Sequence, residues 1–427
     1  MLTKFYYNTM QGSPDLEAEW GSLNDVLKTV LTGDGFNPQN ASGVELVEGG
    51  AKIILALNHG FIKYQVVSVT GADNEDFNKE YRVKLVTDTY IVVNSDISTP
   101  ITGSIVVKTP SMGWTEKFTG EHKSVYQPKD TIKNPFLLRV DNSCPVGFNT
   151  TWAKFARVTI CDGMLDIDNF GDNAKAPCSV EDFDTNEKGN GVTGTNGIYG
   201  WAKWYHGVDD SSSGNYLYES RPTGIKSGYK LNWSIVCDDS SLYLIVKIAD
   251  YEYDTATQDV LYTFTNVKSY NTNDNFNGLL GACDTKKRAV DVSNYMGYDV
   301  PFYIDGGKNT SSATSSGLFL LRNYLGIGDY HAEATVFSLS VSGISGYTSS
   351  ISYPNRVDNS IMLHDVYVKE GSAVRGTMPI IKWVHHKWGG GDKAVLDKGD
   401  GLYLILGSQY PVSSQMLKMY FAYQLEW

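Results

Sequence analysis

The amino-acid sequence predicts a mainly β protein, in which a small N-terminal helix and a β-barrel or β-sandwich module precede a larger, sandwich-like β region with long loops. Runs of β-branched and aromatic residues recur roughly every ten residues, and turn-forming residues separate them. The composition agrees, since 28 Tyr and 16 Phe accompany 42 Gly in 427 residues. Aromatic side chains pack well on sheets, and Gly permits tight turns.

The helix is expected near residue 22, where apolar residues share one helix face at positions i, i+3, i+4, i+7 and i+8. These residues are Leu23, Val26, Leu27, Val30 and Leu31. Ser22 is the expected N-cap, with Asp25 three residues later, and Gly33 is placed to end the helix. We interpret this helix as packing on the sheet of its own domain.

Five short strands are expected to complete a first domain over residues 1–110. They cover residues 53–57, 65–69, 81–86, 90–93 and 101–107. Turn signals such as Asn58-His59-Gly60 separate them. This spacing is typical of a small barrel or sandwich, and the segment Thr109-Pro110-Ser111 is a plausible domain boundary.

The second region, residues 111–427, has longer and less regular patterns, with a possible sub-boundary near 285–315. Strands are expected at residues 136–140, 155–160, 231–236, 242–248, 261–264, 317–321, 335–341, 361–368 and 402–406. Polar stretches at 184–196, 209–215 and 306–316 are expected to be long surface loops. In an assembly protein such loops serve naturally as contact arms.

Charge and cysteine content bear on partners and location. The net charge of −12 disfavours a nucleic-acid partner, because phosphate backbones are repelled. Five cysteines without a C-x-x-C pair indicate a reducing compartment rather than a disulfide framework. The sequence has no signal-peptide core and no run of about 20 apolar residues, so we expect synthesis in a cytoplasm and no membrane insertion.

One loop has some of the chemistry of a calcium site. Asp166, Asp168 and Asp172 are spaced as such a loop begins, but Phe170 stands where Asp or Asn is needed. The adjacent pair His385-His386 makes poor co-ligands, because neighbouring side chains do not share a face. We therefore expect no metal and no cofactor.

Enzymatic motifs are missing from the sequence as well. There is no G-x-S-x-G segment and no phosphate-binding P-loop. The pairs Asp238-Asp239 and Asp209-Asp210 could supply the two carboxyl groups of a glycoside hydrolase. Acidic residues in turns rich in Gly and Ser are far more often solvated, so we expect no enzymatic activity.

A series of short motifs occurs in a distinctive order along the chain. In chain order they are GWTEKFTG (113–120), HKSVY (122–126), LRVD (138–141), ARV (156–158), MLDID (164–168), WSIVCD (233–238), FTNVKS (264–269), YPN (353–355) and VRGTMP (374–379). This series resembles structural proteins of Mu-like and related tailed bacteriophages and prophages. Residues 58–83 likewise resemble a module of phage tail and fibre proteins. Thr265-Asn266 and Ile380 depart from the family pattern, which implies a distant relative.

The resemblance implies a virion structural protein without catalytic residues, associated with the tail, baseplate, neck or collar and assembled in the bacterial host cytoplasm. Its partners would be other virion proteins and further copies of the chain, in a ring with threefold or sixfold symmetry. A receptor-binding adhesin remains an alternative, as does, with less support, a glycan depolymerase. An adhesin would bind host glycans through loop aromatics, for which the candidates are Trp201, Trp204, Trp383 and Trp388.

The residues within the matched motifs are expected to be structural. Trp114 and Trp233 are candidate core aromatics. Arg139 with Asp141, and Arg157 with Asp166, could form ion pairs that orient loops. Asp238 and Arg375 complete the set of structural candidates.

Overall fold

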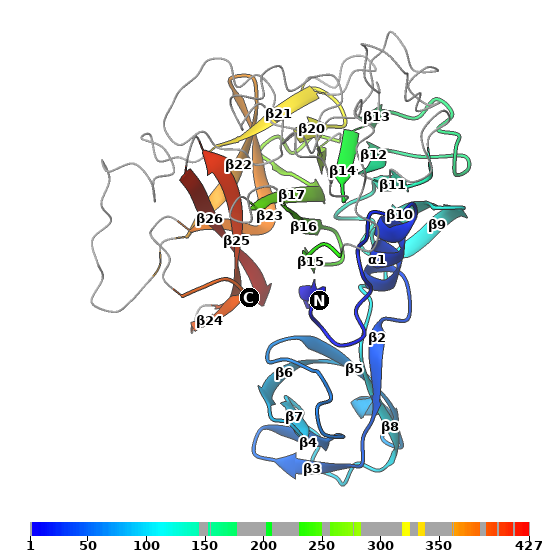
Figure 1. Ribbon diagram of the computed structural model, residues 1–427, viewed down its shortest axis with the longest axis vertical. Coiled ribbons are helices and arrows are strands. Elements are labelled where there is room, and N and C mark those ends of the chain that lie inside the picture. The colour runs from blue at the N-terminus through cyan, green and yellow to red at the C-terminus, as the bar shows by residue number, and fades with distance from the viewer. Residues whose placement is uncertain are drawn as a thin grey trace.

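The computed structural model describes residues 2–144, 153, 155–176, 202–206, 230–249, 257–275, 277–282, 318–324, 332–337, 361, 363–384, 390–398, 401–412 and 415–426. These residues are mainly strands, as the sequence predicts, and they form three antiparallel sheets (Figure 1). The described part contains one α-helix, α1 (Ser22–Leu31), and one 3-10 turn, η1 (Glu75–Phe77). No helix in that part has the length and apolar character required to cross a bilayer.

A small module lies at one end of the long axis of the molecule (Figure 1). Its strands are β2 (Phe36–Asn40), β3 (Gly43–Val47), β4 (Gly50–Ile54), β5 (Val66–Ala72), β6 (Glu80–Val86), β7 (Tyr90–Val93) and β8 (Gly103–Thr109), in the spatial order β2-β8-β5-β6-β7-β4-β3. Ala41 and Ser42, which connect the end strands β2 and β3, donate to Ile105 O in β8 and to Ile54 O in β4, each at 2.9 Å. The curled sheet encloses its own apolar core.

The largest sheet joins the N-terminal strand to strands from the second half of the chain. It contains β1 (Lys4–Tyr7), β15 (Trp233–Cys237), β16 (Leu242–Ala249), β17 (Thr257–Asn266), β18 (Lys268–Ser269), β19 (Gly278–Gly281), β20 (Leu318–Leu320), β21 (Ala332–Phe337), β22 (Leu363–Glu370), β23 (Ala373–Val384), β24 (Ala394–Lys398), β25 (Gly401–Val412) and β26 (Gln415–Glu426). The sheet is curved so strongly that β17 packs against β25, although the two strands are not neighbours in it. Inside this curve the rings of Tyr243 and Tyr423 meet edge to face, 5.6 Å apart.

A third sheet flanks the helix (Figure 1). Its strands are β9 (Thr115–Gly120), β10 (Lys123–Gln127), β11 (Leu137–Asp141), β12 (Phe155–Cys161), β13 (Lys175–Ala176) and β14 (Ala202–Tyr205). One continuous apolar core joins this sheet, the helix and the largest sheet. Trp114 of this region meets Phe264 of β17, with ring centroids 5.8 Å apart.

Helix α1 shows where local sequence reasoning was wrong. The N-cap is Gly21, with φ of 91°, and not Ser22. The N-terminus of the helix is capped by the side chain of Asn142, a residue distant in the sequence. Gly21 N and Leu23 N donate to its Oδ1 at 3.0 and 3.1 Å. At the other end, Thr32 N and Gly33 N both donate to Lys28 O.

The helix also has a different place from the one expected. Its five apolar residues are buried in the core of the two larger sheets and not in that of the small module. Strand β1 likewise belongs to the largest sheet. The expected first domain, 1–110, is therefore divided between two cores, and the separate small sheet spans only residues 36–109.

A group of polar contacts joins the small module to the body. Arg82 is nearly buried, and its guanidinium donates to Tyr64 O at 2.7 Å, Thr3 O at 2.8 Å and Leu425 O at 3.1 Å. Beside it, Lys4 Nζ donates to Glu80 Oε1 at 2.6 Å. Arg82 thus holds β6 against the chain next to β1 and against β26.

Replacing Arg82 with Ala tests this junction. Three backbone oxygens at the junction would lose this donor, and each buried unsatisfied group costs about 1–3 kcal/mol. We expect the free energy of unfolding to fall by about 2–4 kcal/mol, with faster amide hydrogen exchange in β1 and β26. The control is Lys52→Ala, which removes an ion pair with Glu45 from the module surface and should cost about 1 kcal/mol or less. Equal losses in the two variants would show that Arg82 does not fasten the module.

Candidate functional site

A buried charge network lies between β10, β11, β12 and the loop over residues 162–171. At its centre, Asp141 accepts from Arg157 Nη2 at 2.9 Å and from Arg139 Nη2 at 3.2 Å. Ser143 also donates to this carboxylate, through its hydroxyl and its backbone N–H. The predicted pair of Arg139 with Asp141 forms. Arg157 pairs with Asp141 and not with Asp166, because β11 and β12 run side by side and place these residues opposite each other.

The same network fixes the loop that follows β12. Arg139 Nε donates to Ile167 O at 2.7 Å, and its Nη2 bonds to Asp168. Lys123 Nζ lies 2.8 Å from the Asp168 carboxylate. Sequence reasoning missed Lys123 and Ser143, although Ser143 closely follows the LRVD motif. Three cationic and two anionic side chains therefore gather here, with Asp141 the most enclosed acceptor.

Electrostatics keeps Asp141 ionised. Burial alone would raise the pKa of its carboxyl, but the adjacent guanidinium groups of Arg157 and Arg139 lower this pKa below its ordinary value. The pKa of Asp168 is also lowered: burial opposes the shift, while Lys123 and Arg139 favour it. Both carboxyl groups are therefore ionised at neutral pH, and both can form ion pairs with Arg139.

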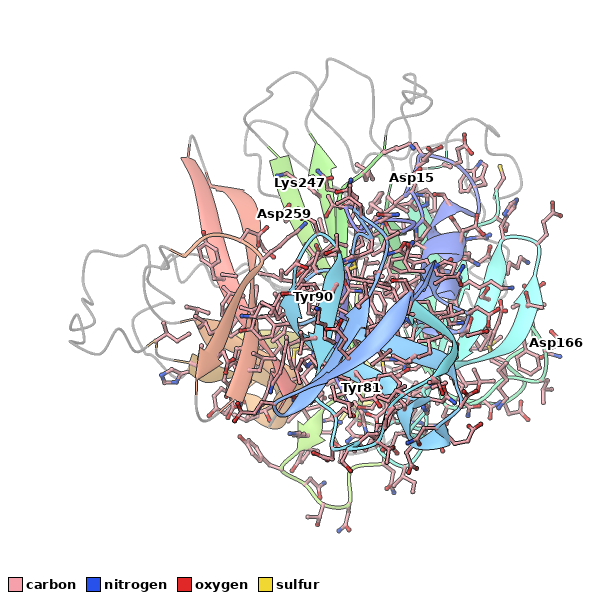
Figure 2. The ribbon with its side chains drawn as sticks, turned by 90° about the horizontal axis from the view of Figure 1, so that it is seen from below. Asp15, Tyr81, Tyr90, Asp166, Lys247 and Asp259 are labelled. Carbon is pink, nitrogen blue, oxygen red and sulfur yellow. The ribbon has the colours of Figure 1, made fainter. Side chains whose placement is uncertain are left out.

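The candidate calcium loop is occupied by protein groups. Asp168 faces Lys123 and Arg139, so side-chain cations stand where a metal would be needed. Asp166 accepts a bond from Asp168 N at 2.8 Å and lies at the outer edge of the molecule (Figure 2). Asp172 is exposed. Within the described ranges, no group of three or more His, Cys, Asp or Glu side chains is arranged to hold a metal ion.

A second buried network centres on Arg375 in β23. Its guanidinium donates to Asp274 Oδ2 at 2.7 Å and to Glu370 Oε2 at 2.7 Å, and its carbon lies 5.3 Å from the Tyr324 ring centroid. Arg375 Nη1 also donates to Arg322 O at 3.3 Å. The register of β22 and β23 shifts at this point, so Arg375 has no opposite residue in β22. Such a bulge re-aims a side chain, and here Arg375 is fully buried.

A third buried arrangement surrounds Asn142, a residue that was not among those predicted from the sequence. Its Nδ2 donates to Phe155 O at 3.2 Å and to His206 Nε2 at 2.8 Å, while its Oδ1 caps α1. Since the helix N–H groups fix the orientation of the amide, His206 Nε2 must be the acceptor. The other ring nitrogen, Nδ1, then donates to Glu17 O at 3.1 Å. His206 is therefore held neutral.

The candidate tryptophans were expected in two roles, as core residues and as glycan-binding loop residues. Trp114 and Trp233 are buried, as predicted for core residues. Trp204 and Trp383 are also fully buried, in contact with Tyr262 and Phe421, so they are wrong as candidates for sugar stacking. All four residues of β14 are buried, so no alternation in the sequence marks Trp204 as a core residue. Trp201, Trp388 and the pair His385-His386 lie outside the described residues.

The candidate carboxylate pair Asp238-Asp239 shapes a turn. Asp238 Oδ1 accepts from Ser240 N at 2.8 Å and Ser241 N at 2.7 Å, and burial raises the pKa of its carboxyl. Asp239 lies 3.4 Å from Lys133 Nζ. The backbone oxygen of Asp238 also accepts from Trp114 Nε1 at 2.9 Å. The second pair, Asp209-Asp210, lies outside the described residues.

The chain was also compared with known proteins. No family model matches it, and no curated protein matches it. The arrangement of its own residues is therefore the basis for a function.

The buried network predicts a large difference between two similar substitutions. Asp141→Asn removes the charge shared by Arg139 and Arg157, and breaking a buried ion pair costs about 3–5 kcal/mol. Asp168→Asn changes a side chain that is 54% exposed and should cost about 1 kcal/mol or less. Urea unfolding at pH 7 measures both. Because the folded-state pKa of Asp141 is lowered, its contribution should persist above about pH 4 and be lost below it. A smaller loss for Asp141→Asn than for Asp168→Asn would contradict the assignment.

His206 predicts a second pH dependence. Burial lowers its pKa to about 4, whereas an unfolded chain binds this proton near pH 6.5. Stability should thus be complete above about pH 6.5 and fall by about 3 kcal/mol as the pH drops to 4. In His206→Gln, the side-chain oxygen can replace Nε2 as acceptor without titrating. Unfolding curves between pH 7 and pH 4.5 should therefore be less pH-dependent for the variant. Parallel curves for the two proteins would refute this role.

Proposed function

We propose that the protein is a non-enzymatic structural component of a tailed-bacteriophage virion. In this proposal it belongs to the tail, the baseplate or the neck and collar, and it is assembled in the cytoplasm of the bacterial host. It acts through contacts with other virion proteins and with copies of itself, in a ring of threefold or sixfold symmetry.

One observation carries the proposal: motifs that are separate in the sequence contribute side chains to two shared networks. LRVD, ARV and MLDID contribute Asp141, Arg157 and Asp168 to the first network. FTNVKS lies directly before the loop with Asp274, and VRGTMP supplies Arg375, which meets Asp274 in the second. This convergence supports reading the motif series as one structural unit.

The chemistry of the networks agrees with a scaffold role. The charged side chains of both networks bond to one another and to the backbone of neighbouring loops. Hydrogen-bonded buried networks rigidify the segments they join. Loops held in this way can present a constant surface to each partner, as a repeated contact in a symmetric ring requires.

The proposal can be tested on particles from a lysate of cells that produce the chain. Gradient-purified particles should contain the chain in a fixed ratio to the other virion proteins, measured by quantitative mass spectrometry. Native mass spectrometry of the purified chain should show a closed trimer or hexamer, or a monomer that enters particles on mixing. Presence in the lysate together with absence from the particles would refute the proposal.

Two variants make this test specific. Arg375→Leu leaves the enclosed Asp274 carboxylate and the half-buried Glu370 carboxylate without their guanidinium, and it should reduce incorporation at least tenfold. Lys52→Ala changes only a pair at the surface of the small module and should be incorporated normally. Circular dichroism spectra of both variants establish whether the purified chains are folded before incorporation is compared.

A further inference from the structure

Several exposed or half-buried side chains belong to the segments that meet at Arg375: the Tyr324 ring lies 5.3 Å from its guanidinium carbon, Tyr270 N donates to its backbone oxygen, and Val374 precedes it in β23. Tyr270 is 63% exposed, Val374 is 40% exposed and Tyr324 is 39% exposed. Tyr367 of β22 is half-buried and forms a hydroxyl contact with Tyr270. We call these four residues the tyrosine platform. They come from β22, β23 and two separate loops, so the fold and not the local sequence assembles them.

Hydrogen bonds to Arg375 and Glu370 fix the backbone of the two exposed tyrosines of the platform. Tyr270 N donates to Arg375 O at 2.9 Å, and Tyr324 N donates to Glu370 Oε2 at 2.9 Å. The loop that carries Tyr270 is further fixed by Ser269 Oγ, which bonds to Asp274 at 2.9 Å. The backbone of both tyrosines is thus tied to the ion pairs of Arg375. A rigid aromatic surface loses little conformational entropy when it binds.

We propose that the tyrosine platform binds a neutral glycan. Tyr rings combine an apolar face with a polar hydroxyl, and a sugar ring offers the complementary pair, a face of C–H groups edged by hydroxyls. The charges beneath the platform are compensated, since Arg375 is paired with Asp274 and Glu370. An uncharged ligand also avoids the repulsion that a net charge of −12 exerts on polyanions.

This site differs from the one expected from the sequence. The tryptophans considered for sugar stacking, Trp204 and Trp383, are buried, whereas Tyr270 and Tyr324 are exposed. The platform is independent of the proposed assembly role, because a virion component can assemble with or without a glycan-binding surface. The two proposals can therefore fail separately.

The full chain is first screened on an array of neutral and acidic glycans, and affinities for the bound neutral oligosaccharides are then measured by calorimetry. Tyr270→Ala and Tyr324→Ala should each weaken binding about fivefold or more, and the double variant should abolish it. Tyr90→Ala is the matched control, because Tyr90 is a half-buried tyrosine on the small module, beneath Lys52. The thermal unfolding midpoint of each variant establishes that losses of binding are not losses of fold.

Three outcomes would overturn the proposal. The first is no binding of any neutral glycan at millimolar concentration. The second is binding of acidic glycans or DNA alone. The third is a change of oligomeric mass in Tyr270→Ala, which would identify the platform as a contact between copies of the chain. Incorporation of Tyr270→Ala into particles is measured in parallel, so a failed glycan site remains distinct from a failed assembly role.

Discussion

The side chain of Asn142 accepts hydrogen bonds from Gly21 N and Leu23 N and donates to Phe155 O and His206 Nε2. Its partners lie at the start of α1, in β12 and just after β14, so this one amide sets the position of the helix against the third sheet. The helix in turn contributes its apolar face to the core shared with the largest sheet. Asp could not donate these bonds, and Leu could make none of them.

Local pattern predicted about half of the strands and none of their partners: β9, β10, β23 and β26, for example, had no expected counterpart. The five strands expected in the small module lie within a few residues of β4 to β8, because alternating burial leaves a period of two in the sequence. Strands β2 and β3 were missed, since Pro38 and Gly43 weaken the strand signal and β3 is largely exposed. Strand β1 is buried by β15, more than 220 residues away, and no local pattern reports that pairing.

The candidate site shows the same division. The pair Arg139 with Asp141 could be predicted because both residues lie in one strand, two positions apart. The pairing of Arg157 with Asp141, and of Arg375 with Asp274, depends on strand register and loop closure. Trp204 and Trp383 were misplaced for the same reason, because a tryptophan beside polar segments reads as a loop residue until its strand is known. Long-range geometry decides these cases.

The pairing of β1 with β15 also constrains how the chain is made. Tyr6 lies opposite Ile235, and translation proceeds at roughly 5–20 residues per second. A nascent chain would therefore carry the apolar segment around Tyr6 without its partner strand for on the order of ten to fifty seconds. During this interval the segment offers an open strand edge to any neighbouring polypeptide. Efficient production should accordingly depend on chaperones that shield the segment around Tyr6 until β15 has left the ribosome.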